Sequence, residues 1–153
     1  ILERVKLVQL LKCITVTDLL TGALNMRGIH EIGGKLLKQG KLNEYTCIFL
    51  NIKNFNYINR AVGARQGDMV LREFVRLARQ KLKPDEYFAR MGGDNFVLLA
   101  KKERMGILLE QIVIISPGCL LQQMNGLGIV AVFLCNRFFG KAPNQIPLSG
   151  RWL

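Results

Sequence analysis

The residues that could do chemistry in this chain are an acid and an amide that follow two glycines, Gly92-Gly93-Asp94-Asn95. Short apolar segments flank them, and consecutive glycines supply the positive φ values that a two-residue hairpin turn requires. Because glycines leave room for a ligand beside the backbone, the oxygens of Asp94 would be open to one. Taken alone, the motif favours a plain hairpin in which Asp94 only stabilises the turn.

Length and composition indicate one folded domain. The chain has 153 residues, half of them hydrophobic, which is enough for a single core and argues against disorder. Its longest apolar stretch, near 129–135, is too short to cross a bilayer. The four cysteines form no Cys-x-x-Cys pair and no signal peptide precedes them, so we expect reduced thiols in a cytoplasmic protein. Since the sequence begins with Ile1, we expect it to be a piece of a longer protein.

The net charge of +11 raises the possibility of a basic module that binds nucleic acid or a membrane surface. The basic residues, however, alternate with apolar ones over 70–83, which is typical of a solvated helix face above a buried one. No helix-turn-helix, zinc-finger or RNA-recognition signature accompanies the charge. We therefore expect no specific nucleic-acid partner.

Alternating helices and strands would position the turn. Helices are expected over four segments: 1–12, as an amphipathic helix, 27–39, 55–61 and 68–82. A strand at 45–52 is so apolar that we place it centrally in a sheet, and polar residues gather at its end. Gly40 would end the second helix, Gly63 and Gly67 would bracket a loop, and Asp68 would cap the long helix that follows.

Four segments, in order and at family spacing, resemble motifs of the GGDEF family, the diguanylate cyclase domain of bacterial signalling. Residues 18–27 resemble D-x-L-T-G-L-x-N-R-R, and residues 49–59 resemble F-x-D-x-D-x-F-K-x-I-N. Residues 63–68 resemble G-H-x-x-G-D, and residues 90–96 resemble R-x-G-G-D-E-F.

The resemblance implies an α/β (α+β) fold with a central, mostly antiparallel sheet flanked by helices, like the palm of nucleotide cyclases and polymerases. Family members join two GTP molecules into cyclic di-GMP and release pyrophosphate, with each domain of a homodimer presenting one GTP. Residues 1–17 would form an incoming linker helix and 18–104 the domain core. Residues 105–153 would be a divergent or truncated C-terminal part, because the resemblance stops beyond 135 and no acidic residue follows Glu110.

The resemblance also implies a catalytic metal site, here in altered form. Asp94 matches a metal-binding acid, Asn51 replaces the other one and would be a weak ligand, and Ile52 would offer its backbone. Asn95 replaces the glutamate expected to act on the attacking hydroxyl or its metal, and Lys53 replaces a second aspartate of the strand end. These changes make the site more positive and weaken catalysis.

Residues that contact the nucleotide are better kept. Asn59 and Asp68 match the guanine-contacting pair of the family, and their chemistry suits guanine because a carboxylate accepts from N1–H and N2–H while an amide donates and accepts. Phe55, with Gly92 and Gly93, matches further nucleotide-binding positions. Outside the motif context, Asp68 is equally well a helix cap and Asn59 a helix-end residue.

We therefore expect a degenerate GGDEF domain of cyclic di-GMP signalling that binds GTP or another guanine nucleotide in a regulatory role, with little or no cyclase activity. One alternative is a weakly active diguanylate cyclase that uses Mg²⁺ or Mn²⁺ through Asp94; the degenerate domain would need no metal. The other is a basic nucleic-acid-binding module. Expected partners are a second copy in a homodimer, or an attached sensor or output domain such as a phosphodiesterase EAL-type domain.

Overall fold

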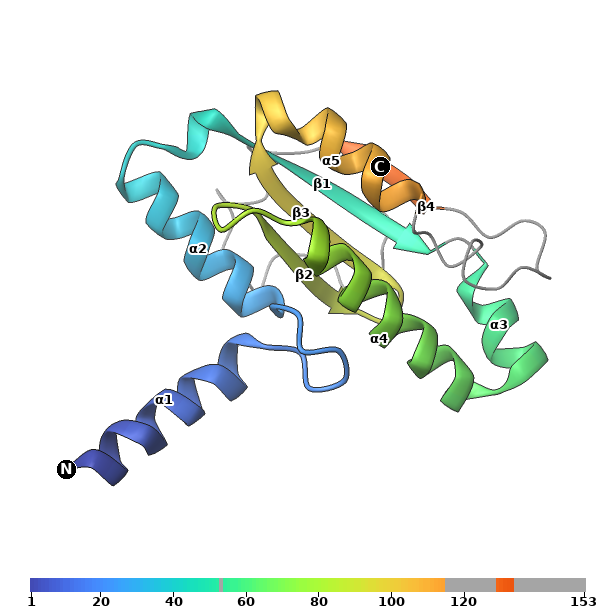
Figure 1. The fold of residues 1–153 in the computed structure, drawn as a ribbon, viewed down its shortest axis with the longest axis horizontal. Coiled ribbons are helices and arrows are strands. Elements are labelled where there is room, and N and C mark those ends of the chain that lie inside the picture. The colour runs from blue at the N-terminus through green and yellow to red at the C-terminus, as the bar shows by residue number, and fades with distance from the viewer. Residues whose placement is uncertain (53, 115–128, 134–153) are drawn as a thin grey trace.

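A computed structural model gives the fold and describes residues 1–52, 54–114 and 129–133 (Figure 1). The helices are α1 (Leu2–Val16), α2 (Met26–Lys38), α3 (Phe55–Val62), α4 (Ala64–Lys81) and α5 (Lys102–Ile114). The strands are β1 (Tyr45–Ile52), β2 (Tyr87–Gly92), β3 (Asn95–Lys101) and β4 (Ile129–Phe133), and a short 3₁₀ turn, η1 (Leu42–Glu44), leads into β1.

The strands form one sheet in the order β2-β3-β1-β4, and every neighbouring pair is antiparallel. β1 lies between β3 and β4, which confirms its predicted central place. Its length matches the predicted segment, because the apolar run starts and ends with the strand. The expected α/β (α+β) class with a mostly antiparallel, helix-flanked sheet is confirmed.

Alternation along β1 divides the core between the two faces of the sheet. Ile48, Leu50 and Ile52 belong to the larger cluster, which includes buried residues of α3, α4 and α5. Within it, the ring of Phe74 on α4 meets the rings of Phe88 and Phe96 edge-on, with centroid distances of 5.8 and 5.1 Å. This contact fixes α4 on the β2–β3 hairpin.

The opposite face of the sheet packs against α2. Tyr45 and Cys47 of β1 cluster there with Ile29 and Leu36, which are buried on α2. The end of α2 confirms the predicted role of Gly40, which has a φ of 68°. The chain is therefore able to turn directly from α2 toward η1 and the central strand.

The first helix runs beyond the periodic segment 1–12 but stays within the predicted linker helix 1–17, and it differs in character from the prediction. α1 runs to Val16, and all of its side chains as far as Thr15 are exposed. Its apolar residues, such as Leu2, Leu7 and Leu10, lie on more than one side of the helix, so the expectation of an amphipathic helix is wrong. In Figure 1, α1 projects away from the sheet.

The long helix α4 begins earlier than predicted. It starts at Ala64, directly after Gly63, whose φ of 92° lets the chain reverse between α3 and α4. Gly67 is buried inside the helix, so the predicted loop between Gly63 and Gly67 is wrong. Asp68 lies within α4 and is not its N-terminal cap.

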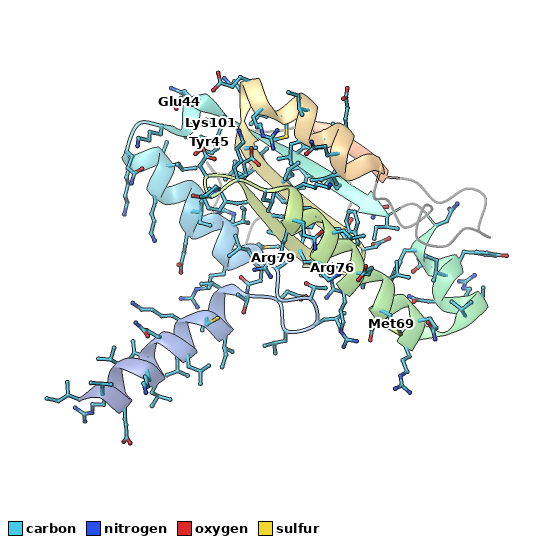
Figure 2. All side chains as sticks on the ribbon, in the orientation of Figure 1. Glu44, Tyr45, Met69, Arg76, Arg79 and Lys101 are labelled. Carbon is cyan, nitrogen blue, oxygen red and sulfur yellow. The ribbon has the colours of Figure 1, made fainter. Side chains whose placement is uncertain are left out.

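The basic residues of α4 follow the prediction of a solvated face. Arg72, Arg76 and Arg79 are exposed, whereas Val70 and Phe74 are buried. Figure 2 shows Arg76 and Arg79 along α4. Two of the arginines also hold the loop that follows α1, because Arg72 Nε donates to the Leu20 carbonyl and Arg79 Nη1 to the Gly22 carbonyl, each at 3.1 Å.

The predicted hairpin is confirmed, but its turn lies one residue later. Gly92 closes β2 opposite Asn95, so the two residues that connect the strands are Gly93 and Asp94. The predicted positive φ values are present, 133° at Gly92 and 54° at Gly93. An irregularity in the pairing between Arg90 and Gly92 produces this shift.

The C-terminal prediction is confirmed in part. The segment expected to hold a helix and a strand, 101–115, contains helix α5 over its described residues. The strand expected within 125–132 corresponds to β4, which pairs with β1; positions 125–128 and the tail at 135–153 lie outside the described residues. Within the described ranges, no helix is long and apolar enough to span a bilayer.

Candidate nucleotide-binding site

The predicted catalytic residues meet where β1 pairs with β3. Asn51 and Asn95 stand directly opposite each other in the register, and Asn51 Nδ2 donates to Asn95 Oδ1 at 2.9 Å. Asn95 Nδ2 in turn lies 3.5 Å from Asp94 Oδ1. The backbone N–H of Ile52 donates to the Asp94 carbonyl at 3.1 Å. The structure therefore brings all the residues of the predicted metal and catalytic site together.

The donor set of this group does not fit a divalent ion as the side chains stand. Mg²⁺ and Mn²⁺ prefer hard anionic oxygens, and Asp94 supplies the only carboxylate among these residues. The amide N–H groups of Asn51 and Asn95 point into the group, toward the oxygens that would have to face a cation. No cluster of three or more His, Cys, Asp or Glu side chains suited to a metal occurs among the described residues.

Arg90 holds the turn to the loop that follows α1. Its Nε donates to the Gly93 carbonyl at 2.9 Å, and its Nη1 lies 3.1 Å from each carboxylate oxygen of Asp18. Thr21 donates to the same carboxylate from its N–H at 2.9 Å and from its hydroxyl at 2.7 Å. Burial alone would raise the pKa of Asp18, but the Thr21 and Arg90 hydrogen bonds outweigh it and lower the pKa.

The positioning role of Asp18 and Arg90 was missed in the sequence. Both residues fall inside recognised motifs, yet neither was given a partner. The available signal was a charged residue at the start of each motif, the acid Asp18 in one and the base Arg90 in the other. Their separation of 72 residues hides the pair until the fold is known.

A second group of predicted residues meets between α3 and α4. Asn59 Oδ1 is buried and accepts no hydrogen bond from the part of the chain that the structure describes. The Asn59 oxygen lies against Gly67. A Cβ added at Gly67 would collide with this oxygen and would lie 3.2 Å from Phe55 Cζ. Asp68 follows Gly67 on α4 and is half-buried. Asn59, Phe55 and Gly67 are thus in one place, with Asp68 next to it in the chain.

The buried oxygen of Asn59 has no donor among the described residues, and because its surface is covered, a ligand N–H could reach it only after the amide turns outward. An unsatisfied buried acceptor costs free energy, so a partner N–H at this point is favoured. Gly67 keeps side-chain atoms away from Asn59, and this role was missed because Gly67 was assigned to a loop. The predicted guanine-contacting function of Asn59 and Asp68 stays a prediction.

The start of α3 connects the two groups. β1 ends at Ile52, whose N–H donates a hydrogen bond to the Asp94 carbonyl, and α3 begins three residues later at Phe55. The first N–H groups of a helix have no partner within it and carry partial positive charge, which suits an anion. The Phe55 side chain is buried in the core, so only its backbone N–H is available for the predicted contact.

The turn itself is open. Gly92 and Gly93 are exposed, and a Cβ built at either one would meet no described residue within 4 Å. Their positive φ values therefore explain the glycines without any close neighbour in the described chain. Their predicted nucleotide contacts stay a prediction, for which the open backbone leaves space.

Comparisons with known proteins agree with the motifs. The sequence model described as "Diguanylate cyclase, GGDEF domain" matches residues 15–116. The chain is 29% identical over 98 residues to the cyclic di-GMP phosphodiesterase PdeR of Escherichia coli, a match that covers 64% of this chain and 15% of PdeR. It is 32% identical over 77 residues to the diguanylate cyclase DgcS of Shewanella oneidensis, covering 49% of this chain and 26% of DgcS. The chain thus spans about a quarter or less of these relatives.

Solved structures show the same fold. A microbial GGDEF domain studied for its interaction with cyclic di-GMP superposes with a TM-score of 0.64 at 27% identity, covering 79% of this chain and 76% of that one. The coiled coil and GGDEF domain of DgcB from Caulobacter crescentus superposes with a TM-score of 0.69 at 19% identity, covering 86% and 75%. The family match covers residues 15–116, well over half of this chain. The chain therefore belongs to the GGDEF family of diguanylate cyclase domains.

Proposed function

We propose that this GGDEF domain binds guanine nucleotide in a regulatory role within cyclic di-GMP signalling and makes little or no cyclic di-GMP. The observation that carries the proposal is the buried oxygen of Asn59, which lacks a partner among the described residues and lies against Gly67. Guanine offers N–H donors to such an oxygen and to a carboxylate at Asp68, whereas adenine has no N1–H.

The amides of Asn51 and Asn95 support the proposal that this domain has little or no cyclase activity. A carboxylate at position 95 could accept a proton from an attacking hydroxyl or hold its metal with a negative charge, whereas the neutral amide of Asn95 is no base and brings no charge to a metal. Its oxygen already accepts a hydrogen bond from Asn51. Among these residues only the carboxylate of Asp94 is left to organise the triphosphate. We propose that one carboxylate is insufficient for sustained turnover.

The relatives suggest how such a domain would be used. One is named a cyclic di-GMP phosphodiesterase and another a diguanylate cyclase, and each is far longer than the matched segment. We propose that the domain acts on an attached sensor or output domain, or on a second copy of itself. Guanine nucleotide would be the signal that it reports.

Calorimetric titration with GTP and with ATP tests the base pocket. We expect GTP to bind at least about tenfold more tightly than ATP, because a pocket built around hydrogen bonds rejects a base that cannot make them. Asn59→Ala should remove that preference, and Asn43→Ala, which removes an exposed amide of η1, should keep it. Equal affinity for the two nucleotides, or no binding of either, would contradict the proposal.

An activity assay separates the proposal from the weakly active cyclase. Incubation with GTP and Mg²⁺ or Mn²⁺ should yield no sustained formation of cyclic di-GMP. Steady production that disappears on Asp94→Ala would favour the cyclase instead, because the activity would then depend on the remaining acid of the turn.

A further inference from the structure

We infer that the hydrogen-bonded group Asn51-Asn95-Asp94 takes the place of a metal centre, so that this domain binds nucleotide as the metal-free anion. The inference rests on the proposed nucleotide binding for its ligand, but the replacement of the metal centre can be tested without nucleotide. In this inference Asn51 and Asn95 do not act as weak metal ligands. They hydrogen-bond to each other and to Asp94 in the space that a metal ion would occupy.

The direction of the hydrogen bonds carries the argument. Asn51 donates to Asn95 across the strand pair at 2.9 Å, and the amide N–H of Asn95 faces Asp94 Oδ1 at 3.5 Å. Both contacts join a donor to an acceptor, so the amide of Asn95 has a partner on each side without an ion. A cation would have to compete for the Asn95 oxygen with the Asn51 N–H and for Asp94 Oδ1 with the Asn95 N–H.

The backbone fixes this arrangement. Asn51 and Asn95 are paired in the β1–β3 register, and the next backbone contact, from Ile52 to the Asp94 carbonyl, holds the turn against the end of β1. Side chains directly opposite each other in antiparallel strands have their Cβ atoms about 4.5–5.5 Å apart, which is within reach of an amide pair. The pair is therefore a consequence of the fold and the two residue types.

The charge of Asp94 then acts in the opposite sense from a metal ligand. Without an ion between them, the carboxylate repels a nearby phosphate. Replacing the carboxylate by an amide should leave nucleotide affinity unchanged or raise it, by about twofold for a solvent-screened charge. In a metal-dependent site, the same Asp94→Asn change would weaken nucleotide binding and remove its dependence on Mg²⁺.

The experiment compares four forms of the full chain: the wild type, Asp94→Asn, the double variant Asn51→Asp/Asn95→Glu, and the matched control Asn43→Asp/Gln80→Glu. The control adds the same two acids at exposed positions away from the turn. Binding of Mn²⁺ is measured by electron paramagnetic resonance without nucleotide. Binding of GTP is measured by calorimetry in EDTA and in Mg²⁺.

We expect no site-bound Mn²⁺ on the wild type or the control, and Mn²⁺ bound by the double variant, where three carboxylates meet. Affinity of the wild type for GTP should be the same in EDTA and Mg²⁺ within about twofold, whereas the double variant should gain at least about tenfold from Mg²⁺, since its ion would bridge carboxylates and phosphates.

The outcomes separate this inference from the proposed function. If the wild type binds no GTP, the proposed function fails, and the Mn²⁺ measurements still decide the inference. Mn²⁺ bound by the wild type and lost on Asp94→Asn overturns it. A double variant that binds no more Mn²⁺ than the control also overturns it, because the two amides would then not be the reason for the missing metal.

Discussion

Arg90 Nη1 lies 3.1 Å from both carboxylate oxygens of Asp18, and the same guanidinium donates through Nε to the carbonyl of Gly93 at 2.9 Å. One side chain thus links the loop that follows α1 to the turn that presents Asp94. Both members of the pair are largely buried, with 12% of the Arg90 and 19% of the Asp18 side chain exposed. The position of the turn therefore depends on this pair.

Removing the guanidinium should destabilise the domain. Arg90→Ala leaves the carboxylate of Asp18 largely buried without its cation and frees the Gly93 carbonyl, at a cost of about 3 kcal/mol. Urea unfolding followed by circular dichroism measures the change. The control is Arg76→Ala, which breaks an exposed pair with Glu73 on α4 and should leave stability almost unchanged. Equal effects of the two variants would contradict a structural role for Arg90.

The same pair predicts how stability depends on pH. The pKa of Asp18 is lower in the folded chain than its ordinary value, so the charged form favours folding. This contribution is fully present above the ordinary aspartate pKa and is lost as pH falls through the lowered, folded value. The difference in unfolding free energy between wild type and Asp18→Asn should therefore be constant from pH 7 to about 5 and shrink toward pH 2. A difference that stays constant down to pH 2 would contradict it.

A second buried carboxylate, that of Glu86, should also contribute to the stability of the fold. Glu86 is 5% exposed and accepts from the Lys83 N–H at 2.9 Å and from Arg104 Nε at 2.8 Å, so it ties α5 to the start of β2. Arg104→Ala should cost about 3 kcal/mol, because it leaves a buried charge with only the backbone donor. Thermal and urea unfolding measure the loss.

A matched control and a second variant identify the cause. Lys101→Ala removes the cation of the half-exposed pair with Asp85 and should change stability little. Adding Glu86→Gln to Arg104→Ala should recover part of the lost stability, because the neutral amide oxygen can still accept from Lys83 while no unpaired charge remains. No recovery in the double variant would mean that the packing of Arg104, and not its charge, is responsible.

Patterns that act within one segment could be predicted from the sequence. The bounds of the strand Tyr45–Ile52 were predicted to the residue, because its buried positions are all apolar and only Thr46 and Asn51 interrupt the apolar run. The hairpin was found because two consecutive glycines have few other uses between apolar runs. Its turn was misplaced by one residue because the pairing irregularity before Gly92 leaves no mark in the sequence.

Features that depend on contacts between distant segments could not be predicted. The bond between Asn51 and Asn95 requires the register of β1 with β3, and the types of the two residues alone indicated only a weakened site. Gly67 suggested a loop because glycine is unfavourable inside helices. The structure instead places Gly67 against the neighbouring helix α3, where a Cβ would collide with Asn59 Oδ1 unless that side chain moved.

That close approach gives the last prediction. Gly67→Ala places a methyl group against Asn59 Oδ1 and beside Phe55, so α3 and α4 must separate or Asn59 must turn away. We expect a loss of about 1–3 kcal/mol of stability, and a loss of the preference for GTP over ATP in the fraction that stays folded. The control is Gly34→Ala on α2, where a Cβ meets nothing within 4 Å; it should keep the preference and gain up to about 1 kcal/mol. If Gly67→Ala keeps the preference for GTP, the Asn59–Gly67 contact between α3 and α4 does not read the base.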